Sequence, residues 1–279
     1  MKPLVKWPGG KTWLAKSTKR LIEDLKPKTV IEPFGGSGAF SFFFEFEKAI
    51  INDTNIALIN FYNQLQAGHQ ITPERFELTE TFYDHAKLQV NESMYSGKPM
   101  TAEDAGLFWF MVKHGFNGLV RQNKRKGHFN VPFGLYDKMA TPPDTETFLK
   151  VARRWSFING SYTELDYSIA DLIVTDPPYE DYNCKNKKMF RAYTGDENTD
   201  IQNTILNTLP ADKPTIATNI LIPQLVTQYK QAGFKVFSKE VTSSISGKTK
   251  GRQKRKEMVA FRGFTRRKLG SYVSGLKRL

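Results

Sequence analysis

The tetrapeptide Asp176-Pro177-Pro178-Tyr179 holds the residues best suited to chemistry in this chain. It follows the apolar run Leu172–Thr175, which has the composition of a buried strand, so it would lie at that strand's carboxyl end. Open α/β sheets place their binding crevice at this edge. A carboxylate, a carbonyl fixed by a proline ring and an aromatic side chain there would suit a flat heterocycle that carries an amino group. The alternative is a stiff turn, because Asp and Pro are common turn residues.

The elements that would position this tetrapeptide follow an α/β pattern, in which short apolar runs alternate with amphipathic segments. The predicted strands are Thr29–Ile31, Ala49–Asn52, Ser156–Asn159, Leu172–Thr175, Thr215–Thr218, Lys235–Val241 and Met258–Arg262. The predicted helices are Thr12–Leu25, Ala39–Phe46, Asp144–Arg153, Thr199–Leu209 and Ile222–Ala232. Only the basic segment Ser243–Lys256 separates the last two strands, so we expect them to pair antiparallel at the end of the sheet.

Residues 55–141 interrupt this alternation. They contain the helical patterns Ile56–Gln66, Pro73–Val90 and Ala102–Lys113, followed by a polar, turn-rich stretch. Such a length is too great for an ordinary crossover between two strands. We therefore expect a discontinuous catalytic domain, residues 1–54 and 142–264, with an inserted domain at 55–141. Residues 265–279 read as a basic tail with weak patterning, a candidate for mobility.

Composition narrows the function classes. The formal charge of +13 predicts a polyanionic partner, and 39% hydrophobic residues support a substantial core. Cys184 is the only cysteine, which excludes internal disulfides and thiolate clusters, and the four histidines lack a helical metal-ligand spacing, so no metal is expected. No apolar stretch approaches the roughly 20 residues of a membrane span. With no secretory signal at the N-terminus, we expect a cytoplasmic protein without a membrane partner.

A glycine-rich loop, residues 32–38 (EPFGGSG), follows the first predicted strand. Glycines there allow positive φ and bring backbone amides near a cofactor. The loop matches neither the phosphate-binding loop nor the dinucleotide fingerprint. Asp53 ends the next strand at a spacing suited to ribose hydroxyls, although it could instead cap the helix that starts near Asn55. This combination predicts a nucleoside-bearing cofactor without pyrophosphate, and S-adenosylmethionine fits.

Strand order would bring these segments together. In a sheet of order 3-2-1-4-5, the crevice lies between strands 1 and 4, so the glycine loop would face the Asp176 tetrapeptide. The segment 6–11 (KWPGGK) adds two glycines for close backbone approach, together with lysines for charge and an indole for stacking.

Two basic segments are candidates for nucleic-acid contact. Residues 116–134 mix Asn, Arg and Gln, which can bond base edges, with a Lys-Arg-Lys-Gly turn between two β-like runs, which predicts a hairpin. Residues 248–256, together with the basic residues that follow them, form the densest positive region of the chain. Because this segment lies between two predicted strands, we expect it to be held at one end of the sheet, where it could contact a phosphate backbone. A solvated basic loop is the alternative for the first segment, and an unstructured tail for the second.

The order of these motifs resembles that of the Dam-type DNA adenine-N6 methyltransferases, from Lys6 to about Phe264. The resemblance implies a doubly wound, Rossmann-like methyltransferase sheet that uses S-adenosylmethionine. It also implies an inserted, mainly helical target-recognition domain with a β-hairpin. The expected substrate is adenine within GATC or a related short site in double-stranded DNA, with no obligate protein partner evident. A place in a restriction–modification system is one possible context.

The patterns and the resemblance together define candidate site residues. Expected catalytic residues are Asp176, Pro177, Pro178 and Tyr179. Expected contacts to S-adenosylmethionine are Trp7, Lys11, Phe34, Gly36, Gly38, Asp53, Ser161, Tyr162 and Asp176. Expected DNA contacts are Lys6, Phe116, Asn117, Leu119, Arg121, Asn123, Lys124, Arg125, Tyr136, Lys250 and Arg252, with Phe190 and Tyr193 beside the flipped base.

The expected reaction is a direct displacement. The Asp176 carboxylate and the Pro177 carbonyl would each accept one N6–H bond, which localises the amine lone pair toward the methyl group, while Tyr179 stacks on the extruded base. Amino-methyl transfer to RNA adenine or to cytosine N4 is an alternative, as is a catalytically silent DNA-binding relative. Asp176 favours adenine in DNA, because cytosine enzymes more often carry serine before Pro-Pro-Tyr.

Overall fold

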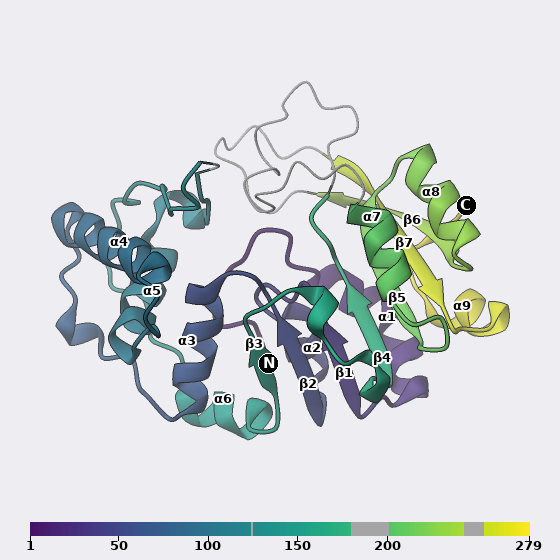
Figure 1. Cartoon of the computed structure of the whole chain (residues 1–279), viewed down its shortest axis with the longest axis horizontal. Helices are drawn as coiled ribbons and strands as arrows, with labels where there is room; N and C mark the ends of the chain where they lie inside the picture. The colour runs from purple at the N-terminus through teal and green to yellow at the C-terminus, as the bar shows by residue number, and fades with distance from the viewer. Residues whose placement is uncertain (124, 180–200, 243–253) are drawn as a thin grey trace.

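A mixed sheet runs through the centre of the molecule in the computed structural model, which describes residues 1–123, 125–179, 201–242 and 254–279 (Figure 1). Over these residues the strand order is β3-β2-β1-β4-β5-β7-β6-β8. The strands are β1 (Thr29–Glu32), β2 (Lys48–Asn52), β3 (Ser156–Ile158), β4 (Leu172–Thr175), β5 (Thr215–Ile220), β6 (Lys235–Thr242), β7 (Lys254–Arg262) and β8 (Lys277–Arg278). The first five pair in parallel, whereas β7 runs antiparallel to both β5 and β6.

This topology confirms the predicted order 3-2-1-4-5 and the antiparallel pair at the end of the sheet. The strands β1 and β4 are neighbours in the order, so the loops after them share the crevice edge. Every residue of β4 is buried, as its continuous apolar composition predicts.

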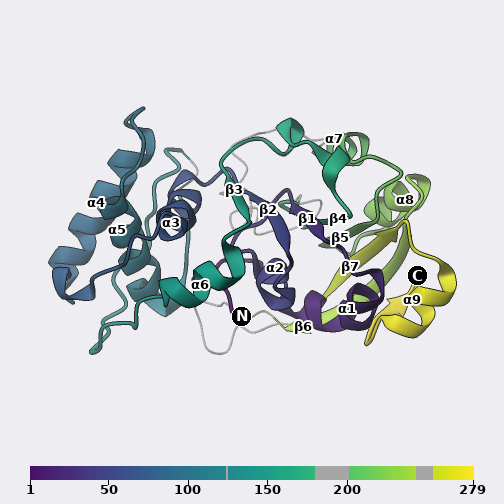
Figure 2. The same cartoon turned by 90° about the horizontal axis from the view of Figure 1, so that it is seen from below.

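Helices cover both faces of the sheet (Figure 2). On one face, α1 (Thr12–Leu25), α2 (Ala39–Phe44) and α9 (Arg266–Tyr272) share an apolar cluster with Val30, Leu172 and Val174. On the other face, α7 (Ile201–Thr208) and α8 (Pro223–Gln231) lie over clusters that contain Ile31 and Ala217. Alternate residues of each strand therefore serve opposite faces, as in a doubly wound sheet.

Three helices extend beyond β3: α3 (Ile56–Gln66), α4 (Glu80–Tyr95) and α5 (Ala102–His114). Thr101 starts α5 with a reciprocal capping box to Asp104, and the helix buries Trp109 completely. One apolar cluster joins these helices with β2, β3 and α6 (Thr145–Ala152). The helices thus pack on the sheet's β3 side, while the proposed boundaries near residues 54 and 142 stay a prediction.

Several predicted bounds are corrected. Helix α4 begins at Glu80, because Pro73–Arg75 forms a separate 3₁₀ turn, and it continues past Val90 to Tyr95. Helix α2 ends at Phe44, since Glu45 adopts a left-handed conformation with φ of 54°. Residues 265–279 are not without pattern, since they form α9 and β8, and their mobility stays a prediction. The hydroxyl of Thr265 caps α9, Leu269 is buried, and β8 pairs with β6.

The segment between α5 and α6 forms two isolated antiparallel bridges, Gly115 to Phe133 and Gln122 to Phe129, in place of named strands over its described residues. The predicted hairpin therefore stays a hypothesis. Across the described ranges, the helices are too short or too polar to span a bilayer.

Candidate active site

Asp176 lies directly after β4, and its carboxylate contacts Thr218 and Lys11. Its Oδ1 accepts a hydrogen bond of 2.6 Å from the Thr218 hydroxyl on β5, and its Oδ2 lies 2.6 Å from the Lys11 ammonium. Thr218 is fully buried, whereas the Asp176 side chain keeps 23% exposure. The carboxylate is thus fixed in orientation yet open to the crevice.

Lys11 brings the N-terminal motif to this carboxylate. Its ammonium also donates to the carbonyl of Gly9 at 2.7 Å and lies 4.0 Å from Oε2 of Glu257. The side chain is only 7% exposed, and a charge buried to this degree is stable only when opposite charges compensate it. The carboxylates of Asp176 and Glu257 provide that compensation. The ion pair thus joins the segment 6–11 to the tetrapeptide, whereas the predicted meeting of the glycine loop with the tetrapeptide rests on the pairing of β1 with β4.

Tyr179 stands beside the same charges. Its ring centroid is 5.3 Å from the Lys11 ammonium and 5.9 Å from the guanidinium carbon of Arg255. Burial raises the pKa of the Tyr179 phenol well above its ordinary value, and the carboxylates of Asp176 and Glu257 add to the rise. The side chain is therefore a neutral phenol at physiological pH.

The glycine loop touches the N-terminal motif at Gly36. This residue has a φ of +51°, and a Cβ atom there would lie 2.7 Å from Cδ1 of Trp7. Glycine is required for both the conformation and the close approach. The Gly36 amide donates to Oδ2 of Asp53 at 3.0 Å, which joins the loop after β1 to the end of β2.

Asp53 does not cap the following helix. Asn55 is the N-cap of α3, since its side chain accepts from the amide of Leu58, whereas Asp53 accepts from the amides of Asn55 and Gly36. Burial raises the pKa of the Asp53 carboxyl, and these two backbone bonds oppose the rise. The alternative role is therefore wrong.

Tyr162 closes the β3 side of this region. Its ring lies 4.9 Å from that of Phe34, at an interplanar angle of 39°. The Ser161 hydroxyl oxygen accepts from the amide of Thr163, so it caps its own turn. The amide side chain of Asn52 donates to the carbonyls of Pro33 and Gly160, which ties the loops after β1 and β3 together. The predicted cofactor residues thus gather along the carboxyl ends of β1 to β4.

Three residues near Asp176 were not among the predicted site residues. Thr218 contacts Asp176 directly and Glu257 lies near it through Lys11, while Glu32, the first residue of the glycine loop, is buried at the end of β1. Burial raises the pKa of Glu32 to about 7. The hydrogen bonds of Glu32 to Ser41 oppose this rise, and the negative charge of Asp176 adds to it. The sequence held a signal for Glu257, the acid that follows the basic run 248–256, and for Glu32, which opens the loop 32–38, but none for Thr218.

Most of the predicted DNA-contact residues lie on the segment after α5, whereas Lys6 belongs to the N-terminal motif. Phe116 and Asn117 are exposed in a 3₁₀ turn, where Asn117 has a φ of 54°. A Cβ atom on Gly118 would lie 3.7 Å from Cδ of Lys6, so the N-terminal motif reaches this segment too. Lys6 therefore links the crevice to the candidate DNA-binding surface.

Arg121 is exposed on the paired part of this segment. Its Nε donates to Oδ1 of Asn130 at 2.7 Å, which orients the guanidinium. Asn123 accepts from the amide of Lys126 at 2.7 Å and so shapes the basic turn, on which Arg125 is exposed.

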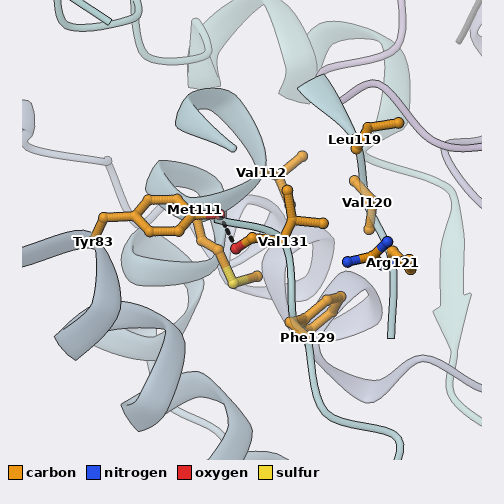
Figure 3. Close-up of a pocket in the computed structure, with 8 residues that line it drawn as sticks. All are labelled: Tyr83, Met111, Val112, Leu119, Val120, Arg121, Phe129 and Val131. Atoms are coloured by element: carbon orange, nitrogen blue, oxygen red, sulfur yellow. Dashed lines mark hydrogen bonds between the residues drawn. The ribbon is translucent and has the colours of Figure 1, made fainter. Parts of the chain in front are cut away.

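Packing from behind supports this segment. A cavity of about 10 Å³ lies between it and α5, lined by Leu119 among others, and the Tyr83 hydroxyl donates to the carbonyl of Val131 at 3.1 Å (Figure 3). The cavity has room for about one water, so it is no base-binding pocket.

A buried histidine holds the far end of the segment. His114 Nδ1 donates to the carbonyl of Phe110 at 2.8 Å, and Nε2 accepts from the amide of Ala140 at 3.0 Å. Burial lowers the pKa of His114, which keeps the ring neutral and suits this pattern. Tyr136 packs edge-on against the same ring, 5.7 Å between centroids.

The basic residues near β7 divide into two groups. Lys254 pairs with Glu240 at the surface, whereas Arg255 pairs with buried Glu257. Lys124, Phe190, Tyr193, Lys250 and Arg252 lie outside the described residues.

Comparison with known proteins places this geometry in a family. The model described as D12 class N6 adenine-specific DNA methyltransferase matches residues 7–245. A DNA adenine methylase of Vibrio cholerae is 33% identical over 197 residues, which cover 68% of this chain and 69% of that protein. One of Haemophilus influenzae is 30% identical over 278 residues, 94% of each chain. A type II methyltransferase of Paramecium bursaria Chlorella virus NC1A is 32% identical over 197 residues, 64% of this chain and 70% of the relative. The chain belongs to the D12 class of N6 adenine-specific DNA methyltransferases and is therefore an enzyme that methylates adenine in DNA.

Proposed function

We propose that the enzyme transfers a methyl group from S-adenosylmethionine to N6 of an adenine flipped out of double-stranded DNA, within GATC or a related short site. The observation that carries this proposal is the contact of Lys11 with Asp176, which joins the N-terminal motif to the tetrapeptide at the carboxyl edge of the sheet. The type II relative makes a restriction–modification system one possible setting.

The residues present fit such a cofactor. Gly36 and Trp7 approach so closely that a side chain on Gly36 would be excluded, and Asp53 offers carboxylate oxygens beside them for ribose hydroxyls. The paired rings of Phe34 and Tyr162 would hold the adenine moiety. The bound cofactor would supply an electrophilic methyl group on a cationic sulfur. Lys11, Gly38 and the turn at Ser161 complete the proposed binding set.

Asp176 and Pro177 would activate the target amine. The exocyclic amine of adenine is a poor nucleophile, because its lone pair is delocalised into the ring. Two acceptors, the Asp176 carboxylate and the Pro177 carbonyl, would each take one N6–H bond and favour a tetrahedral nitrogen. Pro178 fixes the backbone that carries the carbonyl, so the orientation is set before substrate binds. Tyr179 would stack on the extruded base and offset the cost of flipping.

The inserted region 55–141 would act as a target-recognition domain, with the segment 116–134 as a hairpin that enters a groove. Its exposed residues Asn117 and Arg121 suit base edges, while Lys6 and Arg125 suit phosphates. Phe116, Leu119, Asn123 and Tyr136 lie on or beside the same segment.

Replacing the proposed catalytic carboxylate tests the reaction. We expect Asp176→Ala to abolish methyl transfer to a duplex oligonucleotide, measured as N6-methyladenine by nucleoside analysis. Asp176→Asn is the matched variant, because it keeps an oxygen for Thr218 and is expected to fold normally but to be inactive. Thermal unfolding of both variants checks the fold, and normal turnover in either would overturn the role of Asp176.

Replacing Arg121 tests base recognition. We expect Arg121→Ala to lose about 1–3 kcal/mol of discrimination at one base pair, since an arginine bonded to guanine is worth that much. Arg125→Ala is the control from the same segment and should weaken binding to all sequences equally. Competition among duplexes with single substitutions in the site measures both, and an unchanged preference in Arg121→Ala would remove it from the recognition set.

A further inference from the structure

The geometry around β7 points to a function for Arg255 and Glu257: we propose that they are positioning residues, which fix the ring of Tyr179 before the target adenine stacks on it. This inference rests on the proposed function, since it concerns the stacking residue of that site.

Glu257 is a buried carboxylate at the edge of the crevice. It is 1% exposed and lies opposite Ile220, at the carboxyl end of β5. Its Oε1 accepts from Nε of Arg255 at 2.9 Å and from Nη2 at 2.5 Å. Its Oε2 lies 4.0 Å from the Lys11 ammonium and accepts no hydrogen bond from the part of the chain that the structure describes. A carboxylate buried in this way is costly unless cations compensate it.

Both cations that compensate Glu257 also lie against Tyr179. The guanidinium of Arg255 is 5.9 Å from the ring centroid and the ammonium of Lys11 is 5.3 Å from it. Each cation is held by a carboxylate, Lys11 by Asp176 and Arg255 by Glu257. Four charges of zero net sum therefore surround one aromatic side chain, at distances where cation–π attraction acts.

The neighbouring lysine shows that this arrangement is particular to Arg255. Lys254 is 73% exposed and pairs with the exposed Glu240 on β6, as a solvated basic side chain would. Arg255 is 39% exposed and turns toward the buried carboxylate. Both residues belong to the segment 248–256 that was predicted to meet phosphates, yet Arg255 has a partner inside the molecule.

A Tyr179 ring held in this way would lose less conformational entropy when the base stacks on it. A flipped base gains most from an aromatic surface whose orientation is already set, because little side-chain freedom is then lost on binding. Removing Arg255 should therefore reduce the population of the extruded base and the rate of transfer, while leaving cofactor affinity in place.

The test compares Arg255→Met with Arg154→Met, which removes the same charge from an exposed arginine that pairs with Glu47. Duplex DNA with 2-aminopurine at the target position reports extrusion by fluorescence, single-turnover assays report methyl transfer, and calorimetry reports S-adenosylmethionine binding. We expect Arg255→Met to lower both the fluorescence gain and the transfer rate by about 3- to 30-fold, the range that a cation–π contact supplies. Arg154→Met should leave both close to wild type, and cofactor affinity should change less than about twofold in either variant.

Glu257→Gln provides a second arm, since it keeps the shape but not the charge that holds Arg255. It should show the same loss of extrusion as Arg255→Met, whereas Arg255→Lys, which keeps the charge, should recover part of it. If Glu257→Gln fails to fold, the Arg255 variants decide alone. If the wild-type enzyme is active and Arg255→Met behaves like Arg154→Met, this inference alone is overturned. A wild-type enzyme without transfer to DNA adenine would overturn the proposed function as well.

Discussion

Single residues outside the motifs determine how Asp176 can act. Thr218 donates a 2.6 Å hydrogen bond to Oδ1 of the carboxylate from a fully buried position on β5. A hydrogen bond to a charged group contributes about 1.5–3 kcal/mol. We therefore expect Thr218→Val, which removes the hydroxyl without changing the volume, to lower the maximal rate of methyl transfer about 10- to 100-fold.

The matched variant is Thr218→Ser, which keeps the hydroxyl and should retain most of the rate. Because Thr218 acts through Asp176, the loss in Thr218→Val should fall on kcat, while the KM for S-adenosylmethionine changes little. Steady-state kinetics with both substrates separate these quantities. Similar rates for the valine and serine variants would mean that the hydroxyl has no part in positioning the carboxylate.

Glu32 makes the stability of the fold depend on pH. Its pKa is raised from 4.5 to about 7, because burial disfavours the charged carboxylate. Between these values the folded state binds more protons than the unfolded state, so this contribution to stability is present below about pH 4.5 and is lost as pH rises through about 7. Glutamine cannot ionise and can still accept from the Ser41 amide. We expect Glu32→Gln to be more stable than wild type by about 3 kcal/mol at pH 8 and nearly equal at pH 4.5.

Urea unfolding of both proteins across this range measures the difference. The lowered pKa of His114 also makes stability depend on pH, but it acts on both proteins equally and cancels in the comparison. A difference that stays constant with pH would contradict the assignment to Glu32.

At the scale of elements, the glycine loop is defined by two separable requirements. Gly36 has a φ of +51° and no room for a Cβ beside Trp7, whereas Gly97 has a φ of +72° and nothing within 4 Å of the same atom. A left-handed alanine costs about 1–2 kcal/mol. We expect Gly97→Ala to show this cost alone, and Gly36→Ala to show it with a further loss from the displaced indole. Chemical denaturation measures both. If S-adenosylmethionine binding weakens in Gly36→Ala but not in Gly97→Ala, the further loss of stability comes from the crevice. Equal losses of unfolding free energy in the two variants would show that the close approach of Gly36 to Trp7 is unimportant.

The elements themselves were largely predictable, because β1 to β5 carry apolar runs with clear helical segments between them. Their ends were less so. Asn55 rather than Asp53 caps α3, and Glu45 ends α2 by a left-handed turn, choices that depend on local hydrogen bonds. Helix α9 was missed because long-range contacts hold it, among them the pair of Lys268 with Asp24. Thr218 could not be found from motifs, since only strand pairing brings it near Asp176. Glu257 stands out as the acid after the basic run, but only strand pairing brings it near Lys11.

At the scale of the whole molecule, the charge of +13 predicts DNA attraction without saying where it acts. The basic turn with Arg125 and Lys126 belongs to the candidate recognition segment, whereas Arg266 and Arg267 lie on α9 at the opposite end (Figure 1). All four side chains are exposed. Two double variants, each with two arginine or lysine residues changed to alanine, therefore remove equal charge from opposite ends.

Salt dependence distinguishes local contacts from the general field of the protein. Each phosphate contact contributes a slope of about −0.9 to the log–log dependence of duplex binding on salt. We expect the Arg125→Ala, Lys126→Ala variant to lose up to about two such contacts, and the Arg266→Ala, Arg267→Ala variant to keep the wild-type slope. Fluorescence anisotropy with one duplex at several salt concentrations measures both. A phosphate contact made by the segment after α5 would change the slope only in the variant that lacks Arg125 and Lys126. Equal slopes for the two variants would therefore mean that the net charge of the protein, rather than this segment, provides the attraction.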